Sequence, residues 1–274
     1  NEYNLNIPNS YEILKSLMGD NINKKNTPFL SKYHGIFRDK FDVCSIQFAI
    51  HYMFESKTKL HNFLTNVATY TKKGKYFIGT CYDGKKIYKL LKDKQIGETV
   101  DKYYKEKKKV RESSKNDTKI WHIRKGYEDN NDIFLQDSDS CLGYKVSVYQ
   151  ETINQEFDEY LVNFDYFVKI MEDYGFVLAT KPTIMNNSKS VEINAIDSFE
   201  SLFNIMKTNN KSQDYEKYGL AHNMTEKEKN ISFLNNYFIF QKKRDINKNV
   251  LERNIEIDYS IGKAVKTNQK IILT

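Results

Sequence analysis

FDVCSIQ at residues 41–47 and YFIGT at residues 76–80 are two short runs of β-forming residues, and a helical pattern follows each of them. Residues 57–73 follow helical spacing, and a second helical stretch covers residues 85–91. Strand, helix, strand and helix therefore alternate, which predicts a parallel α/β sheet with a buried first strand. Because ligands bind at the carboxyl ends of strands in such sheets, we expect the chemistry directly after each of the two strands.

The helix predicted over residues 57–73 has one apolar stripe and a signal at each end. Ser56 can cap its start, and Gly74 follows Lys72 and Lys73 as its predicted stop. Its apolar side chains recur three and four positions apart: Leu60, Phe63, Leu64 and Val67. This spacing is typical of an amphipathic helix.

Further elements are predicted on both sides of this segment. Residues 11–18 are apolar and predict a strand or a short helix, whereas the Lys- and Glu-rich residues 92–118 are typical of a solvated excursion. The remaining pattern predicts strands over 119–124, 144–149, 159–162, 176–179 and 236–241 and helices over 165–174, 198–207 and 225–234.

The composition excludes several classes of protein. Among 274 residues, 20 Tyr and 17 Phe exclude a disordered chain, and only 11 Gly and 3 Pro exclude a collagen-like one. No apolar run approaches the roughly 20 residues of a membrane span. The cysteines are odd in number and scattered, which predicts neither a disulfide framework nor a zinc site and favours a reducing compartment: Cys44, Cys81 and Cys141. The chain begins at Asn1 without an apolar signal segment, and we expect it to be part of a longer polypeptide.

The net charge of +7 leaves the class of ligand open. An excess of 43 Lys and Arg over 36 Asp and Glu favours phosphate-rich ligands such as RNA. A Lys- and Asn-rich composition that follows an AT-rich genome explains the same charge. The site residues must therefore decide between these interpretations.

Two segments carry candidate site residues. Gln47, Phe48, His51 and Tyr52 follow the first strand and offer hydrogen-bonding groups and flat faces for stacking on a base or on adenosine. Aromatic residues after a strand more often belong to a core, but the ligand-facing end of a parallel strand favours a site. Glu159 opens a predicted strand and by default faces solvent. If it points into a cleft instead, its carboxylate can accept the N1–H and N2–H groups of guanine.

Other motifs carry little or no chemistry. Gly79-Thr80 and Tyr82-Asp83-Gly84 could form the floor of a cofactor pocket, but their composition favours a plain strand-to-helix turn. The sequence contains no G-x-G-x-x-G, no P-loop, no G-x-S-x-G and no H-E-x-x-H. Hydrolase, kinase and metalloprotease functions therefore have little support, and we predict no catalytic acid–base pair and no metal site.

The run FDVCSIQFAIHYMFES at residues 41–56, followed by KGKYFIGTCYDGKKIYKLL at residues 73–91, resembles the mRNA cap guanine-N7 methyltransferases. In that family Q-F-x-x-H-Y-x-F ends a strand before a helix, and a strand reading Y-F-I-G-T follows. EYLV at residues 159–162 and FIFQK at residues 238–242 match in the same order. The resemblance covers residues 18–243 and is closest to the capping enzymes of large cytoplasmic DNA viruses, in which this domain is usually C-terminal.

The resemblance implies methyl transfer from S-adenosylmethionine to N7 of the cap guanosine. No general base is needed, because guanine N7 has a free lone pair, so catalysis would be in-line positioning and electrostatics. The implied cofactor-binding residues are Asp20, Gln47, Phe48 and Tyr52. The implied residues for the cap guanine are His51, Tyr52, Glu159 and Tyr237.

The resemblance also implies an α/β fold, the Rossmann-like sheet of class I S-adenosylmethionine-dependent methyltransferases, here without its first two strands. Residues 1–243 would form the partial methyltransferase domain, with residues 93–162 as an insertion over the cap cleft and residues 244–274 as a basic, polar tail. Two features depart from the family. Its glycine-rich cofactor loop and ribose-binding acid would lie before residue 1, and Asn235 stands where the family often has a guanine-contacting Tyr, with Tyr237 nearby.

Three hypotheses about function remain open. The first is a cap guanine-N7 methyltransferase, the second a catalytically inactive RNA- or cap-binding or regulatory domain of a capping complex, and the third another class I methyltransferase. The expected partners are capped mRNA with a GpppN end and either upstream triphosphatase and guanylyltransferase domains or a capping subunit, with no membrane. A viral protein would be cytoplasmic, in a viral factory or a virion, and any other would be nuclear.

Overall fold

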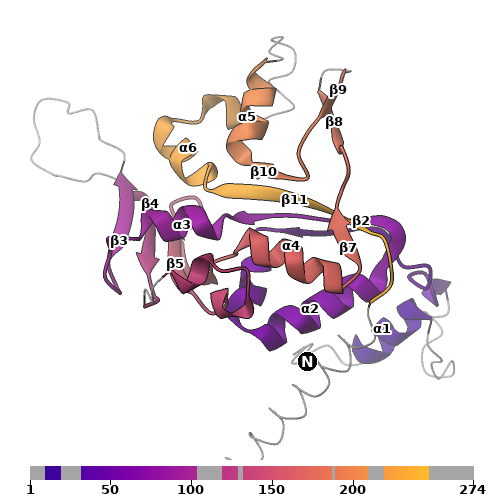
Figure 1. Ribbon diagram of the computed structural model, residues 1–274. Coiled ribbons are helices and arrows are strands. Elements are labelled where there is room, and N and C mark those ends of the chain that lie inside the picture. Colours follow the sequence, from indigo (N-terminus) through magenta and orange to yellow (C-terminus); the bar gives the residue numbers. More distant parts are fainter. Residues whose placement is uncertain are drawn as a thin grey trace, which may run out of the picture.

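The computed structural model of the chain is described for residues 10–19, 32–103, 119–128, 132–186, 189–208 and 219–246. Its centre is a mixed β-sheet in the order β1-β2-β11-β10, with β7 also paired to β11 (Figure 1). β1 and β2 are parallel, whereas β11 runs antiparallel to β2, β7 and β10. The strand bounds are β1 Phe41–Gln47, β2 Thr71–Tyr82, β7 Phe176–Leu178, β10 Ile196–Ser198 and β11 Asn235–Lys242.

β7 and β10 are two pieces on the same side of β11. β7 pairs with residues 240–242 and β10 with residues 236–238, while β2 occupies the other side of β11. Between the two pieces the chain forms a hairpin of β8 (Thr183–Asn186) and β9 (Lys189–Glu192) that stands away from the sheet (Figure 1). The five strands of this sheet therefore occupy four positions. β11 is antiparallel to β1 and β2, and the edge position next to it, shared by β7 and β10, runs parallel to β1 and β2.

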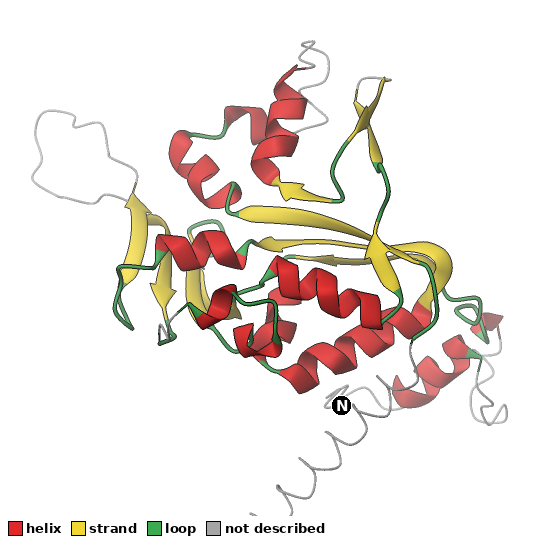
Figure 2. Ribbon diagram, viewed as in Figure 1, coloured by secondary structure: helices red, strands yellow, loops and turns green. Residues whose placement is uncertain are grey.

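Helices cover both faces of this sheet (Figure 2). α2 (Lys57–Tyr70) and α4 (Phe164–Asp173) lie on one face. α5 (Phe199–Thr208) and α6 (Glu226–Ser232) lie on the other, together with the hairpin. The remaining helices are α1 Ser10–Met18, α3 Gly84–Leu90 and the 3-10 turns Ile50–Glu55 (η2), Ile133–Leu135 (η3), Asp139–Cys141 (η4) and Ala221–Asn223 (η6).

The segment of the chain between α3 and α4 forms a second, antiparallel sheet. Its strands follow one another in the order β3-β4-β5-β6, and β6 packs against η2, which directly follows β1. The end of β1 in the main sheet and the end of β6 in the second sheet are thereby brought together. The bounds are β3 Thr99–Tyr103, β4 Lys119–Lys125, β5 Lys145–Gln150 and β6 Gln155–Tyr160.

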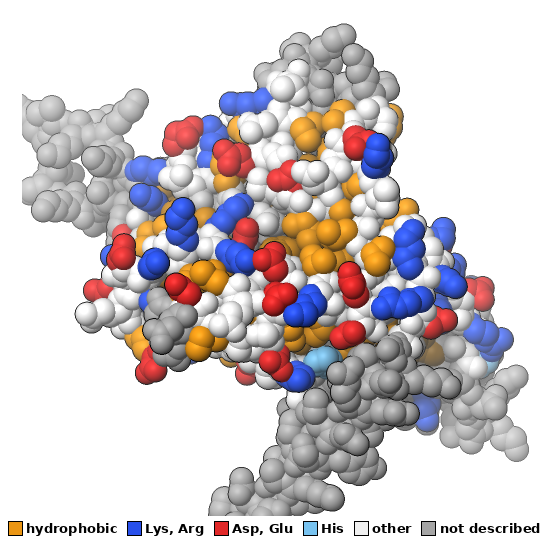
Figure 3. All heavy atoms as spheres, viewed as in Figure 1, with side chains coloured by type: hydrophobic (Ala, Val, Ile, Leu, Met, Phe, Trp, Pro, Cys, Tyr) orange, Lys and Arg blue, Asp and Glu red, His pale blue; other side chains and the backbone are white. Residues whose placement is uncertain are grey.

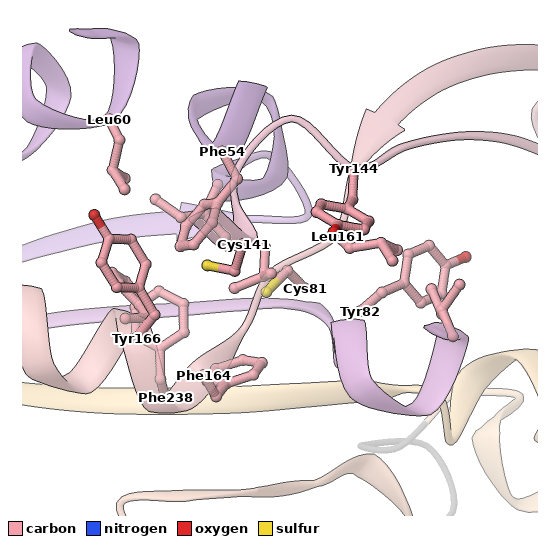
Figure 4. Packing of buried hydrophobic residues seen from close by; sticks show 14 of the residues in the cluster. Phe54, Leu60, Cys81, Tyr82, Cys141, Tyr144, Leu161, Phe164, Tyr166 and Phe238 are labelled. Atoms are coloured by element: carbon pink, nitrogen blue, oxygen red, sulfur yellow. The ribbon is translucent and has the colours of Figure 1, made fainter. Parts of the chain in front are cut away.

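Aromatic side chains build the core between the main sheet and its helices. The ring of Phe238 on β11 lies 5.2 Å from those of Phe77 and Phe167, with tilted or edge-to-face geometry that favours aromatic pairs. Gly79 makes this packing possible, because a Cβ at that position would lie 2.3 Å from the Ile46 carbonyl oxygen and 2.4 Å from the Phe238 ring. Figure 4 shows part of this core, including Phe54, Leu60, Phe164, Tyr166 and Phe238.

The predicted α/β fold is confirmed, with the parallel pair β1 and β2 where the sequence indicates it. The first strand is less buried than expected, since β1 ends the strand order and Val43 is 51% exposed. The predicted helix over residues 57–73 ends at Tyr70, and residues 72–74 belong to β2. Glu159 lies near the end of β6 and does not open a strand, and β3 was not predicted.

The other predicted elements agree with the structure to within a few residues. Residues 11–18 form a helix, α1, and the strands and helices predicted after residue 118 all occur. Only residues 244–246 of the predicted tail lie within the described parts of the chain. None of the helices in the described ranges combines the length and apolar character that a membrane crossing requires.

Candidate functional site

The backbone turns sharply where β1 ends. Phe48 adopts a left-handed conformation with φ of 52°, which is uncommon for a residue other than glycine. Its N–H donates to the carbonyl oxygen of Thr80 on β2 at 2.9 Å, which holds the turn against the neighbouring strand. The side chain of Phe48 is 53% exposed, so a large aromatic ring is presented at the carboxyl end of the parallel pair.

Polar side chains fix the strand ends next to this turn. The Thr80 hydroxyl donates to Oε1 of Gln47 at 2.8 Å, and Nε2 of Gln47 donates to the Ser45 hydroxyl at 2.8 Å. Gln47 and Thr80 are register partners in β1 and β2. The amide of Gln47 is therefore oriented by its neighbours while the residue stays exposed.

His51 and Glu159 meet although 108 positions separate them in the chain. His51 is buried in η2, and Glu159 lies on β6, which packs against η2. Nδ1 of His51 is 3.7 Å from Oε2 of Glu159. The two side chains are only 5% and 13% exposed. Neither ring nitrogen of His51 has a hydrogen-bond partner within the described structure, which is unusual for buried polar atoms.

Burial sets the charge of both groups. Desolvation lowers the pKa of His51 to about 4 and raises the pKa of Glu159 to about 7. The imidazole is therefore neutral near pH 7, and the carboxyl group is close to half ionised. The neutral imidazole offers one hydrogen-bond donor and one acceptor, and the ionised carboxylate offers acceptors only. The pair can therefore bind a ligand whose polar edge carries the complementary groups.

Two tyrosines border this pair. The ring of Tyr52 lies 4.2 Å from that of His51 in an edge-on arrangement, and its side chain is 39% exposed. Tyr82, at the end of β2, is buried, and its hydroxyl accepts a hydrogen bond from Nε2 of Gln150 at 2.7 Å. Burial, reinforced by the charge of Glu159, raises the pKa of Tyr82, so its hydroxyl stays neutral.

Two further candidate residues, Tyr237 and Asn235, lie on β11, and their side chains donate hydrogen bonds to residues other than this pair. Tyr237 is buried on β11, its hydroxyl donates to the Asn194 carbonyl at 3.0 Å, and burial raises its pKa to about 12. Asn235 is paired in register with Tyr82, its amide donates to the carbonyls that end α6, and its Oδ1 has no partner in the described structure. Asp20 lies outside the described residues.

The second strand end is a turn, as its composition favours. The Asp83 side chain caps α3 by accepting from the Lys85 N–H at 3.0 Å. Gly84 is required there, because a Cβ would lie 2.6 Å from the Val162 carbonyl oxygen. Within this strand end, Thr80 differs because it contacts candidate site residues: its hydroxyl donates to Gln47 and accepts from the N–H of Phe48.

Sequence reasoning missed Gln150 and Phe199 as neighbours of the site. Gln150 ends β5, where only the register of β5 against β4 and β6 places it near Tyr82. Phe199 opens α5, and its ring lies 5.9 Å from that of Phe48. The sequence carries no local signal for either contact, because each one joins segments more than 60 residues apart.

Comparison with known proteins assigns the family. Residues 16–243 match the model of the mRNA (guanine-N(7))-methyltransferase domain. The chain is 31% identical over 150 residues to an mRNA cap guanine-N(7) methyltransferase of Aspergillus clavatus, a match that covers 50% of this chain and 26% of that protein. It is 23% identical over 283 aligned positions to a probable mRNA-capping enzyme of Acanthamoeba polyphaga mimivirus, covering 90% of this chain and 21% of that protein.

The match therefore spans about a quarter of the length of these relatives. A solved S-adenosylmethionine-dependent methyltransferase of Clostridium acetobutylicum superposes with a TM-score of 0.34 at 12% identity, over 82% of this chain and 61% of that one. The assignment rests on the family model, which covers most of the chain, and not on that superposition. The chain belongs to the mRNA (guanine-N(7))-methyltransferase domain family.

Proposed function

We propose that this chain transfers a methyl group from S-adenosylmethionine to N7 of the guanosine that caps mRNA. The observation that carries the proposal is the buried pair of His51 and Glu159, in which the His51 ring nitrogens lack hydrogen-bond partners. Buried polar groups without partners cost stability unless a ligand satisfies them. The family, assigned independently of this geometry, points to the same ligand.

Glu159 would recognise the guanine edge. A carboxylate can accept the N1–H and N2–H groups of guanine together, as a planar pair of acceptors facing a planar pair of donors. His51 would satisfy a further polar atom of the base, and the exposed ring of Tyr52 would border its face. Adenine has no donor at N1, so the same carboxylate would discriminate against it.

Gln47, Phe48 and Tyr52 would form the cofactor side of the site. Their fit is supported by the oriented amide of Gln47 and by the open ring of Phe48, which suit a ligand with a polar amino-acid end and a flat base. S-adenosylmethionine supplies an electrophilic methyl group when bound. We keep Asp20 and Tyr237 as further proposed contacts, to the adenine amino group and to the cap guanine respectively.

The residues of the chain would act by orientation and charge. Guanine N7 carries a lone pair and no proton, so the site needs no general base. Methylation at N7 gives the guanine a positive charge, and the Glu159 carboxylate on its opposite edge would stabilise that charge as it develops. His51 and Tyr52 would hold the base in plane, so that N7 stays in line with the methyl group.

We further propose capped mRNA as the macromolecular substrate, with the net charge of +7 assisting RNA binding. Residues 93–162 would cover the cap, since Glu159 lies in the sheet that they build. Triphosphatase and guanylyltransferase domains, or a capping subunit, would supply the GpppN end. The similarity to a mimivirus protein supports a cytoplasmic viral setting, and the similarity to a fungal protein supports the alternative of a nuclear one.

The direct test is transfer of labelled methyl groups to RNA that carries a GpppA end, with ApppA-ended RNA as the control. The full-length gene product is used, and the product is digested to identify 7-methylguanosine. The proposal predicts label in 7-methylguanosine from GpppA-RNA alone. Cap binding without any transfer would favour an inactive cap-binding domain, and label elsewhere would favour another methyltransferase class.

A further inference from the structure

An aromatic pair connects the two edge strands β1 and β10 of the main sheet at their carboxyl ends. Phe48 directly follows β1 and Phe199 directly follows β10, and these strands are the first and last in the order β1-β2-β11-β10. Neighbouring strands lie about 4.8 Å apart, so three steps separate the two strands by roughly 14 Å. The rings nevertheless lie 5.9 Å apart with an interplanar angle of 79°, and the pair therefore spans the ends of β2 and β11.

A row of polar side chains lies across the sheet beside this pair. Gln47, Thr80, Tyr237 and Asp197 are successive register partners, so they share one face of the sheet. Hydrogen bonds fix both ends of the row. Thr80 donates to Gln47 at 2.8 Å, and the Asp197 carboxylate accepts from the Ser198 N–H at 2.7 Å and from the Asn194 amide at 2.9 Å.

The backbone conformation of Phe48 is imposed by its surroundings. A positive φ at a residue with a side chain persists only where neighbouring contacts over-determine it, and such residues cluster at ligand sites. The N–H of Phe48 is held by the carbonyl of Thr80, and its ring meets Phe199 edge-on. Despite this contact the ring remains 53% exposed, so a face is free to stack on a planar ligand.

The turn after β1 directs its two aromatic groups to different neighbours. The Phe48 ring contacts Phe199 of α5, whereas His51, three residues later, meets Glu159 of the second sheet. Ile50 between them is fully buried and anchors the turn. If His51 and Glu159 take the guanine, the ligand against Phe48 is the other flat group of the reaction, the adenosyl moiety.

We propose that Phe199 is a positioning residue that holds the Phe48 ring for stacking on the adenosyl group of S-adenosylmethionine. Phe199 acts through Phe48 and need not touch the cofactor. This inference rests on the proposed function, because it takes the residues after β1 as the cofactor side. An aromatic pair contributes more stabilisation than its buried area alone accounts for. Loss of the Phe199 ring should therefore leave the Phe48 ring less well held and weaken cofactor binding several-fold.

The test compares Phe199→Ala with Phe203→Ala, a matched variant on the same helix. Phe203 is buried against Phe233 at 5.4 Å, so its truncation damages α5 without removing the contact to Phe48. Binding of S-adenosylhomocysteine and of the cap analogue GpppG is measured by calorimetry on the full-length gene product. Phe199→Ala is expected to weaken S-adenosylhomocysteine about five- to tenfold while GpppG stays within about twofold. Phe199→Tyr should restore the affinity, and Phe203→Ala should lower Tm while leaving both affinities unchanged.

A double-variant cycle separates action through Phe48 from direct contact. In a Phe48→Ala background, Phe199→Ala should have no further effect on S-adenosylhomocysteine binding. Additive losses, unchanged affinity in Phe199→Ala, or equal loss of both ligands would overturn the inference and leave the proposed function standing. A wild-type protein that binds neither ligand would overturn the proposed function and this inference with it.

Discussion

At the scale of single residues, the site is defined by two groups whose burial opposes their charge. Glu159 has a folded-state pKa near 7, above its ordinary 4.5, and His51 has one near 4, below its ordinary 6.5. The buried carboxylate therefore lowers stability as pH rises through 7, and the buried imidazole lowers it as pH falls below 6.5. Such costs are retained in a native protein where function requires the groups.

Replacing Glu159 with Gln should raise stability at pH 8 and change it little at pH 4. The unfolded chain ionises this carboxyl near pH 4.5 and the folded chain only near pH 7, so the wild-type protein loses stability across that window. The variant has no proton to lose there. By the size of the shift, the gain at pH 8 should be on the order of 3 kcal/mol.

Urea unfolding at both pH values measures this difference. Glu192→Gln is the control, because Glu192 is 60% exposed and only loosely paired with Lys181 at 3.8 Å. A gain for Glu159→Gln that is equal at pH 4 and pH 8 would show that its carboxyl group does not titrate as the burial requires.

Part of this site could be predicted from the local sequence, whereas the rest depends on contacts between segments that are distant in the chain. Gln47, Phe48, His51 and Tyr52 could be placed because they follow a strand that its own composition reveals. The orientation of Glu159 could not be predicted, since it depends on the register of β6 against β5 and on the packing of β6 against η2. The local pattern at Glu159 favoured solvent, and the fold overrides it.

At the scale of elements, the junction of α2 and β2 shows how a charged residue can end a helix. Lys242 is 1% exposed, and its ammonium donates to the Ala68 and Thr71 carbonyls at 2.6 and 3.0 Å. These carbonyls lie at the end of α2, where the helix leaves acceptors unsatisfied. The Lys72, Lys73 and Gly74 signals belong to the irregular start of β2, whose pairing with β1 is interrupted between Phe41 and Val43.

Replacing Lys242 with Met should destabilise the protein by about 1–3 kcal/mol, because two buried carbonyls lose a charged donor. The affinities for S-adenosylhomocysteine and for GpppG should not change, since α2 ends at the start of β2, at the opposite end of that strand from Thr80 and Tyr82. Lys243→Met serves as the matched control, because Lys243 is exposed. Denaturant unfolding and calorimetry make the comparison, and an equal effect of the two variants would contradict the capping role.

The strand split by the β8–β9 hairpin shows where pattern-based prediction stops at this scale. β10 has three residues, too few for a two-residue alternation to mark it, whereas β7, which is equally short, agrees with the strand predicted over residues 176–179. Without β10 the start of α5 could not be placed next to Phe48. Long and strongly patterned elements such as α2, α4 and β11 were predictable for the opposite reason.

At the scale of the whole molecule, two sheets meet at the proposed site. β1 supplies Gln47, the turn and η2 that follow it supply Phe48, His51 and Tyr52, and β6 of the second sheet supplies Glu159. Basic and acidic side chains are mixed over the face seen in Figure 3, with hydrophobic groups gathered near its centre. The excess of positive charge is therefore not concentrated on this face.

The division between sheets predicts how the kinetic constants depend on pH. Because Glu159 must be ionised to accept from guanine, KM for capped RNA should rise about tenfold per pH unit below pH 7. KM for S-adenosylmethionine should stay constant over this range, since its proposed site is at the end of β1 and does not use Glu159. Steady-state kinetics between pH 5.5 and 8.5 test this, and a parallel rise of both constants would argue against separate sites.

The proposed contact between Glu159 and the cap guanine can be tested by removing one hydrogen bond from the cap. Inosine lacks the N2 amino group of guanine and keeps N1–H and N7, so IpppA-ended RNA deletes one of the two contacts proposed for Glu159. The measurement is kcat/KM for methyl transfer to GpppA- and IpppA-ended RNA by the wild-type protein and by Glu159→Ala. A hydrogen bond to a charged group contributes about 1.5–3 kcal/mol, so the wild-type protein should prefer guanosine at least tenfold. Glu159→Ala should be slower on both substrates and should not distinguish them. A preference for guanosine that survives in Glu159→Ala would show that Glu159 does not recognise the guanine edge.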